Sequence, residues 1–250
     1  MVCAAVISLS KVVIVGASSG IGEAMARQLA QAGAQVAIVA RRESELLRLA
    51  SEHPDNLRPY VHDVSNVDEV PALFERIEKD MGPVDGLIYA AGVMPKVEEG
   101  EYSFDKDRAM VAVNLLGAIA WMNPAARRFE AAKAGTILGI SSIAGERGRR
   151  GNPVYCTTKA ALSTYLESLR NRCSRYGVNV VTIKPGFVDT AMTRGMPGLF
   201  WLISAEKAAQ TALALARKGT SRSAFVPWRW GLVAYIVRSI PSFIFRKLNF

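Results

Sequence analysis

The chain has 250 residues, 50% of them hydrophobic and 21% charged, which suffices for one large globular domain and excludes a disordered protein. The formal net charge of +9 lies mostly in residues 205–250, where eight Lys or Arg residues accompany a single Glu. The three cysteines lack the spacing of a disulfide framework, which fits a reducing compartment.

Short runs rich in Val and Ile alternate with longer helical patterns. Because continuous apolar strands between helices are typical of a parallel sheet covered on both faces, we expect an α/β fold. The expected fold is a single Rossmann-type domain with a doubly wound, seven-stranded parallel sheet and an apolar, basic C-terminal extension. The N-terminus leads into the first strand, so we expect no signal peptide. The expected strands are 12–16, 35–40, 57–63, 84–90, 135–141, 178–186 and 223–227, and the expected helices lie near 21–32, 43–51, 67–81, 104–131, 152–176 and 205–218.

The first expected strand ends in a glycine-rich turn with the spacing GxxxGxG. Small residues let backbone N–H groups approach a pyrophosphate, and the following helix N-terminus adds positive potential. The alternative is an ordinary tight turn from strand to helix. The predicted cofactor contacts in this turn are Gly16, Ser18, Ser19, Gly20, Ile21 and Gly22.

The second expected strand indicates which dinucleotide binds. Sites for NAD place a carboxylate at its end, but here Ala40 is followed by Arg41 and Arg42. Because a guanidinium can pair with a 2′-phosphate, we expect NADP(H) in preference to NAD(H). The alternative is a pair of solvated arginines that open a helix. Further cofactor contacts are expected at the ends of the third and fourth strands, from Asp63, Val64, Ala91 and Gly92.

Tyr155 and Lys159 are four residues apart and therefore share one face of an expected helix. A nearby ammonium favours the phenolate, so we expect the pKa of Tyr155 to lie below its usual value near 10. Tyr155 can then transfer a proton to or from a carbonyl oxygen that Ser142 also binds. Asn114 can hold a water that relays protons to Lys159. No metal is expected.

These residues resemble the short-chain dehydrogenase/reductase superfamily over roughly residues 10–225. The matching features are the GxxxGxG turn, Asn114, the serines at 141–142, the YxxxK spacing and the segment PGFVDT at 185–190. The resemblance implies an NAD(P)-dependent oxidoreductase acting on CH–OH or C=O groups. The alternative is a non-catalytic NADP(H)-binding scaffold or sensor.

The resemblance also implies roles for single residues. Ser142, Tyr155, Lys159 and Asn114 are its catalytic residues, and Lys159 also binds the nicotinamide ribose. Thr190 meets the nicotinamide carboxamide, in a loop that includes Pro185, Gly186 and Val188. At Tyr89 and Ala90 the sequence departs from the family, which has an Asn at one of these positions.

Residues 227–250 form a strongly apolar segment after a domain of residues 1–226. Pro241 interrupts it and neither half reaches the ~20 residues that cross a bilayer, so we expect two short helices. These helices can lie in a membrane interface with their arginines toward the phosphates. The alternative is packing on the domain or on another subunit of a homodimer or homotetramer. Nucleic acid is not expected, because the basic residues sit among apolar ones.

The expected substrate lid, about residues 188–204, is also apolar and includes Trp201. Arg147, Arg149 and Arg150 lie between the catalytic serine and tyrosine. We expect these arginines and Trp201 to contact a lipophilic or lipid-linked substrate, with the arginines binding a phosphate. The alternative is a solvated loop.

Residues 141–162 and 240–248 are similar to the decaprenylphosphoryl-2-keto-ribose reductase-like members of the superfamily. That similarity implies a polyprenyl-phosphate 2-keto-pentose as substrate and a flavin oxidase as partner. We therefore expect a cytoplasmic protein, peripheral on the inner face of a membrane. The alternative is a soluble ketoreductase with 3-ketoacyl or broad specificity.

Overall fold

The structure is a computed structural model that describes residues 9–98 and 100–248. The expectation of no signal peptide falls largely on residues 1–8, which lie outside the described residues.

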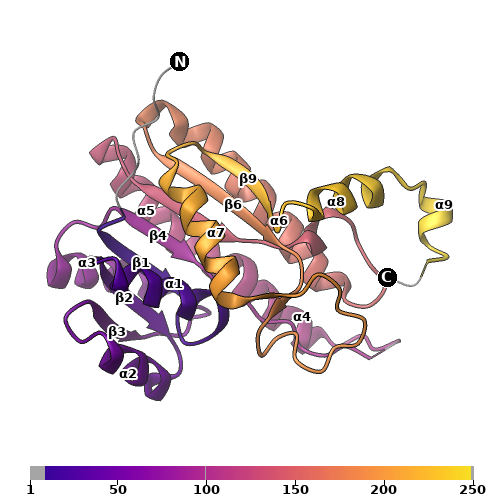
Figure 1. Ribbon diagram of the computed structural model, residues 1–250, viewed down its shortest axis with the longest axis horizontal. Coiled ribbons are helices and arrows are strands. Elements are labelled where there is room, and N and C mark those ends of the chain that lie inside the picture. Colours follow the sequence, from indigo (N-terminus) through magenta and orange to yellow (C-terminus); the bar gives the residue numbers. More distant parts are fainter. Residues whose placement is uncertain (1–8, 99, 249–250) are drawn as a thin grey trace.

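Seven parallel strands form one sheet in the order β3-β2-β1-β4-β5-β6-β9 (Figure 1). The expected Rossmann-type sheet is thus confirmed. The strand order reverses at β1, which pairs with both β2 and β4, and ligands of such sheets bind at the carboxyl ends of the strands near that point. The strands are β1 Lys11–Val15, β2 Gln35–Ala40, β3 Leu57–Val61, β4 Gly86–Tyr89, β5 Thr136–Ile140, β6 Asn179–Pro185 and β9 Arg222–Val226.

Helices cover both faces of the sheet, which is why its central strands are apolar throughout. Side chains of β1 alternate between two buried clusters: Val12 and Ile14 join the first, and Val13 and Val15 join the second. Figure 1 looks onto the face covered by α1 and α7. The first cluster includes α1 Gly20–Gln31, α2 Glu43–Glu52 and α7 Ala205–Arg217, and the second includes α3 Val70–Met81, α5 Gly117–Ala132 and α6 Pro153–Cys173.

The helix expected over 104–131 is interrupted. A π-helical turn, η2 Ala112–Leu116, separates α4 Phe104–Val111 from α5. By length and composition the run Phe104–Ala132 could cross a bilayer, but half of its most apolar stretch is buried. Trp121 and Phe129 of α5 lie in the second cluster, so this is a core helix of the domain.

Short elements complete the chain. Two strands that the sequence did not reveal, β7 Val188–Asp189 and β8 Ile203–Ser204, pair in parallel and bracket the expected lid. The C-terminal segment forms the two expected helices, α8 Trp230–Ser239 and α9 Ser242–Phe245, which project from the body of the molecule in Figure 1. The 3-10 turns are η1 Val67–Glu69, η3 Ile143–Glu146 and η4 Ser174–Tyr176.

Candidate active site

Close backbone packing shapes the glycine-rich turn between β1 and α1. Gly16 has a φ of +90°, and a Cβ on it would lie 2.4 Å from the Ala91 nitrogen. A Cβ on Gly22 would lie 2.2 Å from the Gly16 carbonyl oxygen. Ser19 makes no side-chain cap within the described part of the chain, so N–H groups in the first turn of α1, such as that of Ile21, remain available. Such a helix N-terminus forms a cradle for phosphate.

Two arginines flank the carboxyl end of β2. Arg42 Nη2 folds back over the glycine turn and donates to Ser18 Oγ at 2.9 Å and to the Ser18 carbonyl at 3.1 Å. Arg41 Nη1 lies 3.5 Å from Asp63 Oδ2. Burial raises the pKa of Asp63, but hydrogen bonds from Ser65 and the charge of Arg41 outweigh it, so the net pKa is below its ordinary value. Of the two predicted cations, Arg42 therefore contacts the glycine turn, and Arg41 lies beside Asp63 at the end of β3.

The other predicted cofactor residues surround the same turn. Ala91 packs on Gly16, as described above, and Val64 is buried. A Cβ on Gly92 would lie 3.5 Å from both Asn114 Oδ1 and Lys159 Nζ, so Gly92 faces the catalytic group. On the opposite side, Thr190 Cγ2 would lie 3.2 Å from a Cβ on Gly20.

Residues 185–190, which we call the β6 loop, carry the remaining predicted cofactor contacts. Pro185 ends β6 and Val188 begins β7. Thr193, which the sequence did not single out, shapes this loop: its Oγ1 donates to the Val188 carbonyl at 2.6 Å and accepts from the Thr190 N–H at 3.2 Å. The loop thereby turns Thr190 toward the glycine turn.

The start of α6 positions Tyr155. Asn152 caps the helix by accepting from the Tyr155 N–H at 3.1 Å, and Pro153 occupies the first turn, where its missing N–H costs nothing. Ser141 Oγ donates to the Lys159 carbonyl at 2.9 Å and thereby ties the end of β5 to α6. The sequence did not reveal the capping role of Asn152, although Asn before Pro is a helix-start signal.

Burial dominates the electrostatics of the catalytic group. Burial raises the pKa of Tyr155, while hydrogen bonding with Ser142 and the charge of Arg149 act in the opposite direction. Burial lowers the pKa of Lys159 to about 8. Lys159 Nζ donates to the Ile140 carbonyl at 2.9 Å and lies 5.8 Å from the centre of the Tyr155 ring. The expectation that Lys159 brings the pKa of Tyr155 below its usual value was therefore wrong for this arrangement.

Asn114 lies within the π-helical turn η2 and is fully buried. Its Oδ1 accepts from the Val93 N–H at 2.8 Å, and its Nδ2 donates to the Val93 carbonyl at 3.0 Å and to Thr158 Oγ1 at 3.2 Å. The side chain thus joins the end of β4 to α6. The proton relay through a water stays a prediction.

Tyr89 explains how the chain departs from the family at the end of β4. Its hydroxyl donates at 2.6 Å to the carbonyl of Val113, which lies in the π-helical turn. A Cβ on Gly117 would lie 2.7 Å from this hydroxyl, so Gly117 makes room for it. Tyr89 therefore supports the turn that carries Asn114.

The three arginines of the loop after η3 have different surroundings. Arg147 Nη1 donates to the carbonyls of Val237 and Ile240, and its guanidinium lies 4.0 Å from the centre of the Phe245 ring. Arg150 Nη2 donates to the Arg246 carbonyl at 3.1 Å. Arg149, half-buried, has no hydrogen bond or ion pair within residues 9–98 and 100–248, and its charge acts on Tyr155.

The structure therefore differs from the expectation for Arg147 and Arg150, which hold the C-terminal segment instead of lining the substrate mouth. The physical reason is that the carbonyls near the ends of α8 and α9 lack helical partners and accept from these guanidinium groups. Arg149 alone keeps a position compatible with substrate. Trp201 belongs to the exposed lid and stacks edge-on against Phe200 and Trp230.

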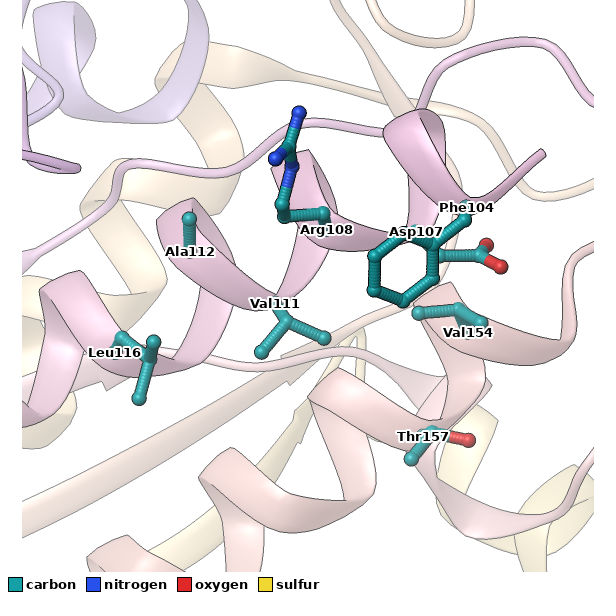
Figure 2. Close-up of a pocket in the computed structure, with 8 residues that line it drawn as sticks. All are labelled: Phe104, Asp107, Arg108, Val111, Ala112, Leu116, Val154 and Thr157. Atoms are coloured by element: carbon teal, nitrogen blue, oxygen red, sulfur yellow. The ribbon is translucent and has the colours of Figure 1, made fainter.

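A groove of about 460 Å³ lies between α4, η2 and the start of α6. Figure 2 shows its lining, in which Val154 and Thr157 come from α6 while the neighbouring Tyr155 does not take part. The groove is thus separate from the catalytic group. Its lining residues are Phe104, Asp107, Arg108, Val111, Ala112, Leu116, Val154 and Thr157.

Comparison with known proteins gives related sequences over most of the chain. Residues 10–197 match the family model described as short chain dehydrogenase. An uncharacterised oxidoreductase of Staphylococcus aureus (strain MW2) is 33% identical over 182 residues, which cover 72% of this chain and 79% of that protein. An uncharacterised oxidoreductase of Staphylococcus epidermidis is 31% identical over 183 residues, which cover 73% and 80%.

Solved structures share the fold. ElxO with NADP bound superposes with a TM-score of 0.79 at 23% identity and covers 89% of this chain and 99% of its own. A short-chain type dehydrogenase/reductase from Mycobacterium ulcerans gives a TM-score of 0.80 at 23% identity, over 86% and 87%.

Proposed function

The chain belongs to the short-chain dehydrogenase family and is an NAD(P)-dependent oxidoreductase, and we propose that it uses NADPH to reduce a keto group on a lipophilic or lipid-linked substrate. The observation that carries the proposal is the buried group of Tyr155 and Lys159, tied to the end of β5 and facing Gly92 beside the glycine turn. Proton-transfer residues next to a dinucleotide cradle suit a carbonyl reduction.

The residues present fit a nicotinamide dinucleotide. The turn at Gly16 and Gly22 leaves no space for a Cβ, so a pyrophosphate can approach its backbone. Thr190 lies across from Gly20, where it can meet the carboxamide, and Lys159 can bind the nicotinamide ribose. When bound, the cofactor supplies a hydride to the carbonyl carbon.

The chain's own residues supply the proton. Tyr155 donates its phenolic proton to the carbonyl oxygen, and Ser142 donates a hydrogen bond to the same oxygen and orients it. With a pKa near 8, Lys159 exchanges a proton readily close to neutral pH. Arg149 favours the phenolate that remains after proton transfer, because its positive charge lowers the pKa of Tyr155.

A preference for NADPH over NADH is supported by the two arginines at the end of β2. Arg42 is held over the glycine turn by Ser18, and Arg41 is only weakly engaged by Asp63 at 3.5 Å. Both can contact a 2′-phosphate. ElxO, which has the same fold, has been solved with NADP bound. A lower KM for NADPH than for NADH is the expected result.

The lid and the C-terminal segment support a lipophilic substrate and contact with a membrane. Exposed apolar side chains in both include Phe200, Trp201, Trp228, Leu232, Tyr235, Ile236 and Phe243. Basic residues of the segment can reach lipid phosphates beside them. The proposed place of the protein is therefore cytoplasmic and peripheral on the inner membrane face, and a polyprenyl-phosphate 2-keto-pentose supplied by a flavin oxidase is the proposed substrate.

The proposed assembly is a homodimer or homotetramer. The groove of Figure 2 supports it, because Phe104 of α4 and Leu116 of η2, which both line it, are exposed apolar residues. A second subunit could cover them. Light scattering of the purified protein tests this assembly.

The decisive experiment measures NADPH oxidation in detergent against lipid-linked keto-sugars, 3-ketoacyl thioesters and steroid ketones. Tyr155→Phe is expected to lower kcat by at least about a hundredfold on any substrate that the wild type reduces, because the proton donor is lost. Tyr102→Phe, which alters an exposed tyrosine outside the lid and the C-terminal segment, is the matched control. Retained activity in Tyr155→Phe would contradict the mechanism. Turnover of 3-ketoacyl thioesters without detergent would favour the soluble ketoreductase instead.

A further inference from the structure

Trp230, the first residue of α8, lies against the backbone of the β6 loop. It is 3% exposed, whereas Trp228 in the same segment is 75% exposed. A Cβ on Gly186 would lie 1.9 Å from Trp230 Nε1 and 2.0 Å from Trp230 Cε2. The pyrrole edge of the indole therefore rests directly on Gly186, and a larger residue at position 186 would displace it.

This contact lies next to the catalytic serine. β5 and β6 are parallel neighbours, and Ile140 pairs with Ile183. Continued two residues beyond β5, this register brings Ser142 level with Pro185, the residue before Gly186. Because adjacent strands lie about 4.8 Å apart, the indole and Ser142 lie at the same end of neighbouring strands.

The indole N–H is a buried donor without an acceptor. Within the described part of the chain, Trp230 Nε1 has no hydrogen-bond partner. The rings of Phe187, Phe200 and Trp201 surround the indole at centroid distances of 5.3, 5.0 and 5.7 Å, and they present no carbonyl or hydroxyl oxygen. Buried donors are nearly always satisfied in native proteins, so a donor left over beside a catalytic group points to a ligand.

We propose that Trp230 is a specificity-determining residue whose indole N–H donates to a second oxygen of the substrate, on the carbon next to the reacting carbonyl. This inference rests on the proposed carbonyl reduction. The carbonyl oxygen is held by Ser142 and Tyr155, so an oxygen on the neighbouring carbon is the group that reaches Gly186. The preferred substrate class is an α-hydroxy ketone or its ether, in place of a plain ketone.

The loop after Ser142 holds the donor in place. Glu146 Oε1 lies 2.6 Å from Lys184 Nζ, just before the β6 loop, and Glu146 Oε2 lies 3.3 Å from Arg238 Nη1 on α8. Arg147 adds the hydrogen bond to the Val237 carbonyl at 2.6 Å. The loop after Ser142 is therefore joined both to β6 and to α8, and Trp230 is the contribution of the C-terminal segment to the site.

The aromatic rings around Trp230 explain how its indole N–H would discriminate between substrates. Phe200 and Trp201 come from the lid and pack against the indole, whose Nε1 is buried. A plain ketone leaves the N–H unsatisfied in the closed site, and a hydroxyl on the next carbon satisfies it. Sites built to bind a substrate hydroxyl reject the analogue that lacks it, because a buried polar group then stays unpaired.

The test compares two ketones in the NADPH oxidation assay with the full chain: a long-chain methyl ketone and the same ketone with a hydroxyl on its methyl carbon. Trp230→Phe keeps an aromatic ring and removes the N–H. It is expected to lower kcat/KM for the hydroxy ketone about fivefold and to change the value for the plain ketone by less than about twofold. Tyr102→Phe, at an exposed aromatic residue outside the lid and the C-terminal segment, is the control and should change neither.

Two outcomes would overturn the inference. Trp230→Phe could leave the ratio of the two kcat/KM values at that of the wild type, whether both values stay unchanged or both fall by the same factor. It could also raise only the dissociation constant of NADPH, measured by quenching of tryptophan fluorescence, which would assign the N–H to the cofactor. A wild type that reduces neither ketone, nor any member of the wider panel, would instead overturn the proposed function itself.

Discussion

β1 and α8 are both strongly apolar, yet the fold places them in opposite surroundings. Val12, Val13, Ile14 and Val15 of β1 are fully buried between two helical layers. In α8 only Trp230 and Ala234 are buried, while Leu232, Tyr235 and Ile236 are exposed. Four of the five residues of β1 are therefore held by burial, whereas α8 is held at a few points. The position of the C-terminal segment thus depends on single contacts.

Burying the Lys159 ammonium lowers the stability of the folded domain. Burial lowers the pKa of Lys159 from 10.5 to about 8, so between these pH values the unfolded chain binds a proton that the folded chain lacks. Stability therefore rises with pH across this window. Relative to Lys159→Met, the wild type should be less stable by about 3 kcal/mol at neutral pH, with the difference fading toward pH 10.5.

Urea denaturation at a series of pH values measures this difference. Lys218→Met, at an exposed lysine, should follow the wild-type profile throughout. Parallel profiles for the wild type and Lys159→Met would show that the folded protein accommodates the ammonium without cost.

A smaller effect is expected where the segment is fastened. Arg147→Gln removes the charged donor to the Val237 and Ile240 carbonyls, at a local cost of about 2 kcal/mol. Amide hydrogen exchange in α8 should then be about thirtyfold faster, while exchange in β1 stays unchanged. Arg149→Gln, two residues away and without a hydrogen bond or ion pair to α8 in the described structure, should leave α8 exchange at the wild-type rate. Equal acceleration in both variants would mean that the loop as a whole holds the segment.

The smallest effect is expected on the pKa of Tyr155. Arg149→Gln removes a positive charge that lowers the pKa of Tyr155, so that pKa should rise. Reduction requires a protonated Tyr155, so the alkaline limb of the kcat/KM profile for carbonyl reduction should move to higher pH. Arg147→Gln should leave this limb in place. A limb that moves down in Arg149→Gln would show that another group controls it.

Local patterns were enough to predict the sheet and the glycine turn. Runs such as Val12–Val15 are continuous because both faces of the sheet are covered, and this regularity survives in a single sequence. The coming together of Tyr155 and Lys159 also follows from helical periodicity. The bounds of the strands changed by one or two residues, because pairing ends where the glycine turn or a loop begins.

Tertiary contacts of the C-terminal segment could not be predicted in the same way. Arg147 and Arg149 are chemically identical and two residues apart, and nothing local distinguishes the one that binds α8 carbonyls from the one whose charge reaches Tyr155. Trp230 is likewise one of several aromatic residues in a run, and only its packing on Gly186 sets it apart. The pKa of Tyr155 depends on how deeply the site is buried, which no spacing encodes.

The π-helical turn at Ala112–Leu116 holds one residue more than an α-helical turn. Deleting that residue would let α4 run straight into α5 as one α-helix. Because the π-helical turn absorbs the extra residue, Phe104 would keep nearly the same register with Trp121 in the core. The Val113 carbonyl, which accepts from the Tyr89 hydroxyl, would instead be drawn into the regular helical hydrogen bonds. The extra residue therefore shapes the backbone around Asn114 and leaves the spacing of the flanking helices unchanged.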